Sequence, residues 1–449
     1  MRTEGKSLKL ATVVKDAANN GGGGEMGGGN ARDVISSIPS SSISIDTSLP
    51  VPEMKPRIMD LCKDLFRKWS NLDNSYFSVE RVSGGITNLL LKVTVKEASS
   101  DDVFLTVRLY GPNTDLVIDR KRELQALPYI SAAGFGAELL GLFENGMIQS
   151  FIKARTLSPS DMSDPKISAE IASQLRKFHQ VEVVGSKEPQ LWNDISKFLE
   201  QAEVLEFDEE EKHAKYKVIS FKEIHKEVNA LKENKPGEKS GRRSCGENKA
   251  AVGTLGRSRR TSLQWPVADT ITRQLRTSNF PLTELQDLAG HLDAPVVFAH
   301  NDLLSGNLMR NDEEEKLYLI DFEYGSYSYR GYDIANHFNE YAGYDCDYNL
   351  YPGKEAQYHF LRNYLHPDSP HEVDDKDVEA LYIETNTFRL ASHLYWAVWS
   401  LIQARVSPID FDYLGYFFLR YEEYKKQKEA CISLAKEYIS GGSNKGSNC

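Results

Sequence analysis

Apolar residues follow two different spacings along this chain. Between residues 77 and 152 they alternate with polar ones in short runs, and after residue 157 they recur every third or fourth position. Alternation is typical of strands with one buried face, and the longer spacing is typical of amphipathic helices. The strand-like runs are Phe77–Val82, Leu89–Val95, Val103–Tyr110, Gly136–Phe143 and Gly146–Ile152. The pattern predicts an α+β protein with a strand-rich first part and a helical second part.

Three helical runs frame this arrangement. Ile58, Leu61, Leu65 and Trp69 precede the strands at helical spacing, and order is expected to begin near Pro56. A second run extends over residues 157–179, where His179 is expected to cap a helix C-terminus and is given no chemistry. The third run extends over residues 386–403 and contains two tryptophans spaced three residues apart.

Three segments lack such patterns. Residues 1–50 contain a glycine run at 21–29 and a serine-rich stretch at 36–44, so they are predicted to be a disordered tail. Residues 232–264 hold nine Lys or Arg against three Glu, with few apolar residues, and are predicted to be a disordered basic insertion. Residues 441–449 are predicted to be a short disordered tail.

Composition narrows the class of protein. With 449 residues the chain is long enough for two or three domains. No apolar run approaches the ~20 residues needed to span a bilayer, and no secretory signal is apparent at the N-terminus. Five scattered cysteines favour reduced thiols and a cytoplasmic location. A net charge of −11 argues against nucleic-acid binding.

The strongest chemical signal is a polar loop between two short apolar runs. It reads His300-Asn301-Asp302-Leu303-Leu304-Ser305-Gly306-Asn307, and Asp321-Phe322 follows after the second run. One carboxylate can take a proton from a substrate hydroxyl, while Asn307 and Asp321 offer the oxygen ligands that Mg²⁺ prefers. The alternative is an Asx-rich turn that caps its own backbone. Downstream, Asp333 is expected to hold the backbone of this loop.

Two features of the strand-rich part suit a phosphate-bearing ligand. The turn Ser83-Gly84-Gly85-Ile86-Thr87-Asn88 combines adjacent glycines with polar donors, although a plain Gly-Gly hairpin turn fits equally well. Arg108 lies within an apolar strand and is expected to pair with Glu123 of the following helix. The alternative is that Arg108 lies on a solvated face of its strand.

Aromatic residues gather near the C-terminal end. Trp396 and Trp399 share one helix face, and Tyr413 and Tyr416 follow closely. With acidic groups such as Glu340, they suit a pocket for a small organic cation. Aromatics at this spacing also commonly form ordinary core, so both interpretations stay open.

These stretches together resemble the choline/ethanolamine kinase family. The resemblance spans about residues 56–424, apart from the insertion, of which residues 237–260 have no family counterpart. The segment Phe338-Asn339-Glu340-Tyr341-Ala342-Gly343 is more similar to the ethanolamine branch. The segments that carry the resemblance are VSGGITNLL (82–90), LTVRLYG (105–111), HNDLLSGN (300–307), IDFEYGSY (320–327), YDIANHFNEYAG (332–343) and ASHLYWAVWSLIQA (391–404).

The resemblance implies a two-lobed protein-kinase-like fold, with a nucleotide-binding N-lobe at 56–150 and a larger C-lobe at 151–440. It implies ATP- and Mg²⁺-dependent phosphorylation of ethanolamine, the first step toward phosphatidylethanolamine. Asp302 would be the catalytic base, and Asn307 and Asp321 the metal ligands. Substrate would be held by Glu340, Trp396, Trp399 and Tyr416. Cofactor contacts would come from Ser83, Gly84, Gly85, Ile86, Thr87, Asn88, Leu89, Arg108, Glu123, Gln149, Phe151, Ile152 and Arg155.

Other interpretations remain. A choline kinase or a dual-specificity enzyme would share every motif, and a non-catalytic nucleotide-binding protein would share the fold. A protein kinase fits less well, because Asp321-Phe322-Glu323 lacks a third-position glycine. An antibiotic phosphotransferase would share the catalytic loop but not the tryptophan segment. The partner is expected to be a small molecule, with no stable membrane insertion. Oligomeric state is open, and a homodimer is one option.

Overall fold

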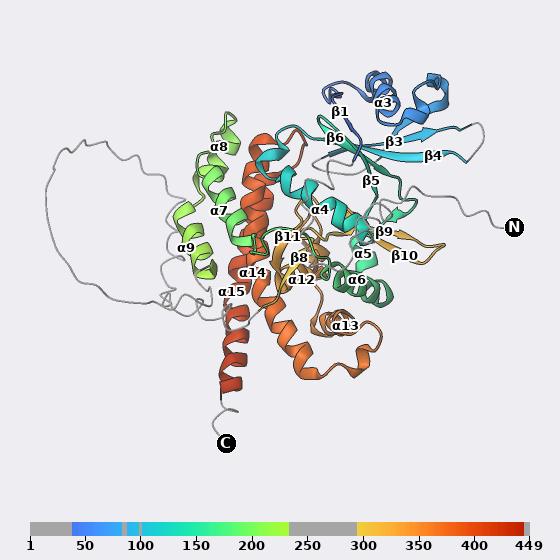
Figure 1. The fold of residues 1–449 in the computed structure, drawn as a ribbon. Helices are drawn as coiled ribbons and strands as arrows, with labels where there is room; N and C mark the ends of the chain where they lie inside the picture. Colours follow the sequence, from blue (N-terminus) through green and yellow to red (C-terminus); the bar gives the residue numbers. More distant parts are fainter. Residues whose placement is uncertain (1–37, 83–87, 98–100, 233–293, 444–449) are drawn as a thin grey trace, which may run out of the picture.

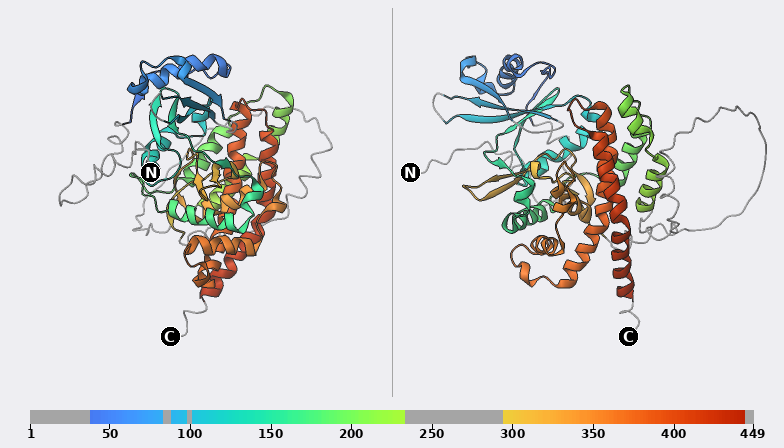
Figure 2. Two further views of the ribbon diagram at one scale, coloured as in Figure 1. Left: turned by 90° about the vertical axis from the view of Figure 1, so that its right-hand side faces the viewer. Right: turned by 180° about the vertical axis from the view of Figure 1, so that it is seen from behind.

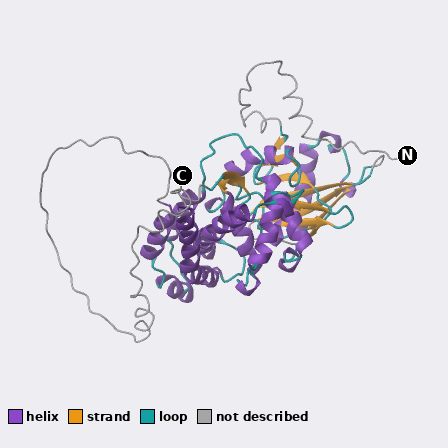
Figure 3. Cartoon of the chain, turned by 90° about the horizontal axis from the view of Figure 1, so that it is seen from below, coloured by secondary structure: helices purple, strands orange, loops and turns teal. Residues whose placement is uncertain are grey.

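The computed structural model describes residues 38–82, 88–97, 101–232 and 294–443 (Figure 1). Within them, strands gather on one side of the molecule and helices fill the rest, as Figure 3 shows. The predicted α+β class is therefore confirmed. The strands are β1 (Ser40–Ser41), β2 (Phe77–Arg81), β3 (Asn88–Val95), β4 (Val103–Tyr110), β5 (Leu139–Phe143), β6 (Gly146–Ser150), β7 (Arg155–Thr156), β8 (Val296–Ala299), β9 (Leu308–Asn311), β10 (Lys316–Leu319) and β11 (Ser326–Tyr329).

The helices follow the predicted order. Most lie after β6, where the chain leaves the large sheet. They are α3 (Val51–Leu65), α4 (Arg120–Ala132), α5 (Pro159–Met162), α6 (Pro165–Phe178), α7 (Leu191–Ala202), α8 (Glu210–Lys217), α9 (Phe221–Lys232), α12 (Arg330–Asn339), α13 (Lys354–Leu365), α14 (Asp375–Val406) and α15 (Tyr413–Ser443).

Six strands form the large sheet, in the order β1-β5-β6-β4-β3-β2. Alternate residues such as Leu91, Val93 and Val107 point to one face, where they pack against Ile58 and Leu61 of α3. On β4, Arg108 lies opposite Leu90 of β3 and Met147 of β6. Arg108 is therefore fixed at the centre of the sheet rather than at its edge.

The prediction that residues 1–50 form a disordered tail is wrong for residues 38–50. Ser40 and Ser41 pair in parallel with Leu142 and Phe143 of β5, and Ile45 is fully buried against α3. Serine-rich composition suggested disorder, but backbone pairing at a sheet edge does not depend on apolar side chains. The Ser-Ile alternation from residue 42 to 45 was the overlooked signal. Residues 1–37 lie outside the described part of the chain.

Helix α4 lies between the large sheet and the helical part (Figure 1). Its Ala126, Leu127 and Ile130 share a core with Met147 of the sheet and with Phe178 of α6. The turn after α4 brings Gly136 against Phe322, since a Cβ there would lie 2.5 Å from the ring. With φ at +66°, Gly136 is also in a region that favours glycine. The predicted strand from Gly136 accordingly begins only at Leu139.

The helical part is built around the antiparallel pair α14 and α15, which lie side by side in both views of Figure 2. Two small sheets, β10-β9-β7 and β11-β8, complete the strands of the described residues. None of the helices in the described residues is long and apolar enough to cross a bilayer. Helix α15 continues to Ser443, so the predicted C-terminal tail at 441–449 begins too early. Except for Lys232, the predicted insertion lies outside the described residues.

Candidate active site

The loop predicted to carry catalysis leaves β8 at His300 and ends in a short 3₁₀ turn, Ser305–Asn307. Asp333 of α12 holds its backbone: one carboxylate oxygen accepts from the His300 N–H and the other from the Asn301 N–H, both at 2.7 Å. The prediction that Asp333 holds this loop is confirmed. Asn301 has φ at +65°, and its side-chain amide donates to the Tyr324 carbonyl at 2.9 Å.

The buried side chain of His179 contacts the carboxylate of Asp333. His179 Nε2 lies 2.8 Å from Asp333 Oδ2, and His179 Nδ1 lies 2.7 Å from the Tyr364 hydroxyl. Burial acts to raise the pKa of Asp333, but these hydrogen bonds and the nearby imidazoles outweigh it, and the pKa is lowered. His179 is the C-cap of α6, as predicted, but its support of the loop was missed. A histidine after an amphipathic helix gives no sequence signal for such a contact.

Asp302 and Asn307 face one another across this loop. The Asn307 amide nitrogen donates to Asp302 Oδ2 at 2.9 Å and to the Asp302 carbonyl at 2.8 Å. Burial raises the pKa of Asp302 well above its usual range, and the carboxylates of Glu340, Asp321 and Glu323 raise it further. The Asx-rich turn interpretation is incomplete, because a cap of local backbone does not account for a buried carboxylate among three others.

The second predicted metal ligand lies next to the first in space. The Ile320 N–H donates to the Asn307 carbonyl at 3.0 Å, where strands β9 and β10 pair antiparallel. Asp321 therefore follows directly after a residue bonded to Asn307, and it turns the chain with φ at +63°. Burial raises the pKa of Asp321, and the nearby Arg108 cation opposes this rise.

A charge cluster connects these loops to the large sheet. Arg108 pairs with Asp321 at 2.6 Å, with Glu323 at 2.7 Å and with Glu123 at 3.2 Å. The predicted Arg108–Glu123 pair is therefore present. Only 4% of Arg108 is exposed, so the alternative of a solvated strand face is wrong. Arg120 was missed, although it contacts Glu123 at 2.8 Å and Glu323 at 3.0 Å.

The residues predicted to cover a phosphate chain are only partly within the described part. Ser83, Gly84, Gly85, Ile86 and Thr87 lie outside it. Asn88 opens β3, and its amide donates to Glu323 Oε2 at 3.0 Å, inside the charge cluster. Leu89 packs against the core between the sheet and α3.

The predicted hinge follows β6. Gln149 pairs with Thr106 at the end of that strand, and the Phe151 N–H donates to the Phe104 carbonyl at 3.3 Å. The Ile152 carbonyl accepts from the Ala154 N–H at 3.1 Å. Arg155 lies on β7, where it forms ion pairs with Asp161 and Asp312 on a partly exposed face. Arg155 is therefore engaged with the helical part.

Aromatic side chains converge beside the catalytic loop. The rings of Trp396 and Trp399 are 5.2 Å apart, and Trp399 lies 6.0 Å from Tyr413. Tyr324, which the sequence argument missed, contacts Trp396 at 5.2 Å between ring centroids and accepts from Trp399 Nε1 at 2.8 Å. Both tryptophans belong to a large core cluster, so the core interpretation is right about their packing.

The predicted acidic group of this region is not free. Glu340 forms an ion pair with Arg420 of α15 at 2.9 Å, and the same Arg420 nitrogen donates to the Tyr416 hydroxyl at 3.0 Å. Arg420 was also missed. An arginine within a Tyr-rich helical run, seven residues after Tyr413, gives little sign of its partner.

The fold and these motifs match known proteins. A model of the choline/ethanolamine kinase family matches residues 79–242 and 266–425. The "Probable ethanolamine kinase" of Arabidopsis thaliana is 57% identical over 414 residues, which cover 92% of this chain and 96% of that protein. The chain belongs to the choline/ethanolamine kinase family. The family model leaves residues 243–265 unmatched, and most of them fall within the predicted insertion. The expectation that residues 237–260 lack a family counterpart is wrong for 237–242, which the model matches.

Two further comparisons, with a choline kinase sequence and with a solved ethanolamine kinase, also match most of the chain. "Probable choline kinase 3" of Arabidopsis thaliana is 30% identical and covers 86% of this chain and 97% of its own. A solved ethanolamine kinase of Plasmodium vivax superposes with a TM-score of 0.63 at 26% identity, over 88% of this chain and 92% of its own. The two-lobed kinase-like fold implied by the resemblance is confirmed.

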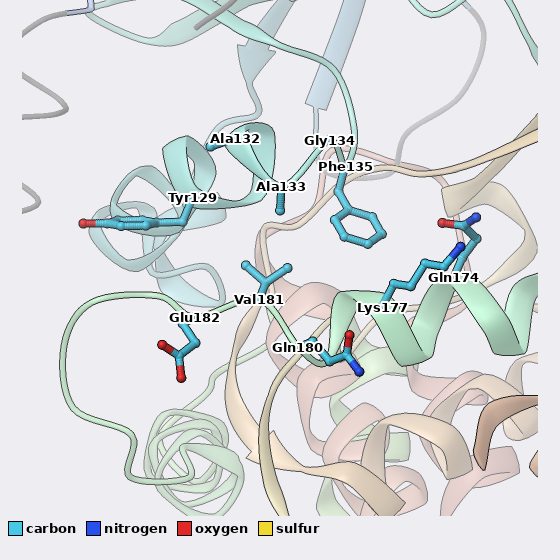
Figure 4. A pocket seen from close by; sticks show the side chains of 10 residues that line it. All are labelled: Tyr129, Ala132, Ala133, Gly134, Phe135, Gln174, Lys177, Gln180, Val181 and Glu182. Atoms are coloured by element: carbon cyan, nitrogen blue, oxygen red, sulfur yellow. The ribbon is translucent and has the colours of Figure 1, made fainter. Parts of the chain in front are cut away.

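A separate groove of about 530 Å³ lies away from these motifs, between the ends of α4 and α6 (Figure 4). Phe135, Lys177 and Glu182 are among its lining residues, and none of the predicted site residues is. It contacts the site only indirectly, through the Phe135 ring against Phe178, which stacks on Phe322. We assign this groove no role in the kinase site.

Proposed function

We propose that the protein is an ethanolamine kinase that transfers the γ-phosphoryl group of ATP to the ethanolamine hydroxyl. The observation that carries this proposal is the arrangement of Asp302, Asn307 and Asp321 near a cluster of aromatic side chains. The carboxylate of Glu340 belongs to the same region. Such a site has a base and oxygen ligands on one side and walls for a small organic cation on the other. Phosphoryl transfer depends mainly on positioning and charge stabilisation, which this arrangement supplies.

Asp302 is proposed to accept the substrate hydroxyl proton. Its raised pKa supports this role, since a base works best when its pKa lies nearer the operating pH. The hydrogen bond from Asn307 orients one carboxylate oxygen and leaves the other for substrate. Asp333 is a positioning residue, because it holds the backbone N–H groups of His300 and Asn301, and His179 positions Asp333 in turn.

Asn307 and Asp321 fit a magnesium ion. Because the side-chain nitrogen of Asn307 points at Asp302, its side-chain oxygen Oδ1 faces away, and no hydrogen bond to Oδ1 is found in the described residues. One carboxylate, one carboxamide oxygen and substrate phosphates form the usual ligand set of Mg²⁺. The ion would neutralise charge on the phosphates. Asn307 and Asp321 would orient it, and Arg108 would balance the surrounding carboxylates.

The strand-rich lobe is proposed to bind ATP. Arg108 and Asn88 would approach the phosphates, and backbone groups from Gln149 to Ile152 would contact adenine. We place the lobe boundary at residues 150/151, where β6 ends. A cytoplasmic location and a first step toward phosphatidylethanolamine complete the proposal.

Ethanolamine is favoured over choline for two reasons. Identity to the "Probable ethanolamine kinase" of Arabidopsis thaliana is 57%, against 30% for the "Probable choline kinase 3" of the same plant. The ammonium group of ethanolamine also carries N–H donors, which need acceptors in the pocket, and Glu340 supplies a carboxylate. Choline lacks those donors and would be held by aromatic faces and charge alone.

The test is Mg-ATP-dependent phosphorylation of ethanolamine and choline at equal concentrations by the purified full chain. A strong ethanolamine preference is expected, with loss of turnover when EDTA removes the metal. Equal or choline-favoured turnover would contradict the assignment of ethanolamine as the preferred substrate. It would not affect the role proposed for Asp302. Nucleotide binding without turnover of either alcohol would support a non-catalytic binding protein instead.

A further inference from the structure

Arg420 is the largest fully buried side chain of the molecule's described part. One of its nitrogens, Nη1, donates both to Glu340 Oε1 at 2.9 Å and to the Tyr416 hydroxyl at 3.0 Å. A guanidinium has donors in a rigid planar fork, so it fixes the positions of the groups it contacts. Two residues predicted to form the amino-alcohol pocket are thereby held by a single cation that does not itself belong to that prediction.

The second terminal nitrogen of Arg420 extends this arrangement to the catalytic loop. Nη2 donates to the Ser392 hydroxyl at 3.2 Å, which in turn donates to Asn336 Oδ1 at 2.8 Å. Asn336 Oδ1 also accepts from Trp396 Nε1 at 2.7 Å. The Asn336 amide nitrogen donates to the Asn301 carbonyl at 3.1 Å. A buried hydrogen-bond network therefore connects Asn301, the residue before Asp302, to three residues of the predicted pocket. These are Trp396, Tyr416 and Glu340.

The donors and acceptors along this network are mutually consistent. The Ser392 hydroxyl donates once, to Asn336, and accepts twice, from Arg420 and from Asn339. That uses its full capacity and fixes which way each side-chain amide points. These bonds restrict rotation of Ser392 and Asn336, because turning either side chain would leave further buried groups unpaired, although Arg420 Nε and Asn339 Oδ1 have no partner among the described residues.

Resting on the proposed function, we propose that Arg420 is a positioning residue that sets the preference for a primary over a quaternary ammonium. Arg420 occupies Glu340 Oε1, so the carboxylate offers its other oxygen in one fixed direction. An N–H donor gains from a directed acceptor, whereas a quaternary head group only experiences the charge. Arg420 also offsets that charge, which weakens the attraction that choline would depend on.

The test compares kcat and KM for ethanolamine and choline in the wild type, Arg420→Lys and Arg389→Lys. Lysine keeps the charge, but one ammonium cannot span both Ser392 and the Glu340–Tyr416 pair. We expect the ethanolamine KM of Arg420→Lys to rise about tenfold, with kcat nearly unchanged and choline KM changed less than about twofold. Arg389 is the matched control, since it is also buried but pairs with Glu423 and stacks on Tyr351. Arg389→Lys should keep the wild-type ratio.

An unchanged ethanolamine-to-choline ratio in folded Arg420→Lys would overturn the proposal. If Arg420→Lys does not fold, Tyr416→Phe decides, because it removes one of the two Nη1 acceptors without removing a charge. A ratio equal to wild type in Tyr416→Phe would then overturn the proposal, and a fall of about threefold would support it. Wild-type protein without turnover of ethanolamine would refute the proposed function itself, and the selectivity role of Arg420 with it.

Discussion

The guanidinium of Arg108 lies 2.6 Å from the carboxylate of Asp321, although 213 residues separate them. The contact joins the central strand of the large sheet to the loop that carries the proposed metal ligand. Glu123 and Glu323 bind the same guanidinium, and Arg120 contacts both of them, so two cations balance three carboxylates. The charge of the proposed nucleotide-binding side and that of the proposed metal site are thereby coupled through Arg108.

Arg108→Met is expected to destabilise the protein and to raise the KM for ATP. Removing one partner of a buried ion pair leaves uncompensated charges, which costs about 3–5 kcal/mol. Urea unfolding measures the free energy, and initial rates measure the KM. Arg81→Met, on the exposed end of β2, is the matched control and should change neither. An Arg108→Met variant with wild-type stability would contradict the coupling.

Asp302→Asn is expected to lower kcat by about 10²–10⁴-fold, the usual contribution of a positioned base. The variant should be at least as stable as wild type, because the carboxylate is buried among Glu340, Asp321 and Glu323, all of the same charge. Turnover and thermal unfolding are measured on the same preparation. Asp115→Asn, at an exposed turn, controls for the substitution itself. Near-normal turnover in folded Asp302→Asn would remove the base assignment.

Asp333→Asn is expected to lower kcat by about tenfold or more and to destabilise the protein by about 1–3 kcal/mol. An amide has one acceptor oxygen, whereas Asp333 accepts from two backbone N–H groups and lies against His179. Asp374→Asn is the control, since Asp374 accepts a backbone N–H at the start of α14, distant from the loop. If both variants lost activity equally, the specific role of Asp333 would be wrong.

His393→Leu is expected to stabilise the protein by about 1 kcal/mol at pH 7, because neither imidazole nitrogen of this buried side chain has a hydrogen-bond partner among the described residues. Burial, together with Arg420 and Arg389, holds the pKa of His393 well below 6.5. The unfolded chain therefore takes up a proton first as the pH falls below 6.5, and the folded state loses stability from there downward.

The difference between His393→Leu and wild type should accordingly grow between pH 6.5 and pH 5. Urea unfolding at several pH values measures it. His371→Gln, at an exposed site, should follow the wild-type pH dependence. A stability difference independent of pH would show that the His393 imidazole does not titrate as argued.

Deletion of residues 243–265 is expected to leave the free energy of unfolding and the turnover unchanged. The family model leaves this segment unmatched, and the surrounding sequence is rich in Lys, Arg, Gly and Ser and poor in apolar residues. Thermal unfolding and initial rates on the deletion variant measure both quantities. A large loss of stability would mean that the segment packs against the fold.

The sequence by itself determined the class of fold, the order of strands and helices and the catalytic motifs. These depend on local properties: the spacing of apolar residues, the polar residues of one short loop and the pairing of Arg108 with the next helix. Local composition misled at both ends of the fold, at residues 38–50 and at residues 441–443. Ser40 and Ser41 form a strand because the edge of β5 offers hydrogen bonds to any extended segment.

Only the tertiary structure decided which buried groups hold the proposed site in place. His179 behind Asp333, Arg120 beside Glu323, and Arg420 beneath Glu340 are each separated in sequence from at least one main partner by 80 residues or more. The identity of a polar residue does not reveal its distant partner, because charge and hydrogen bonding depend on the position that packing assigns. The motifs were therefore visible in the sequence, and the interactions that orient them appeared only in the fold.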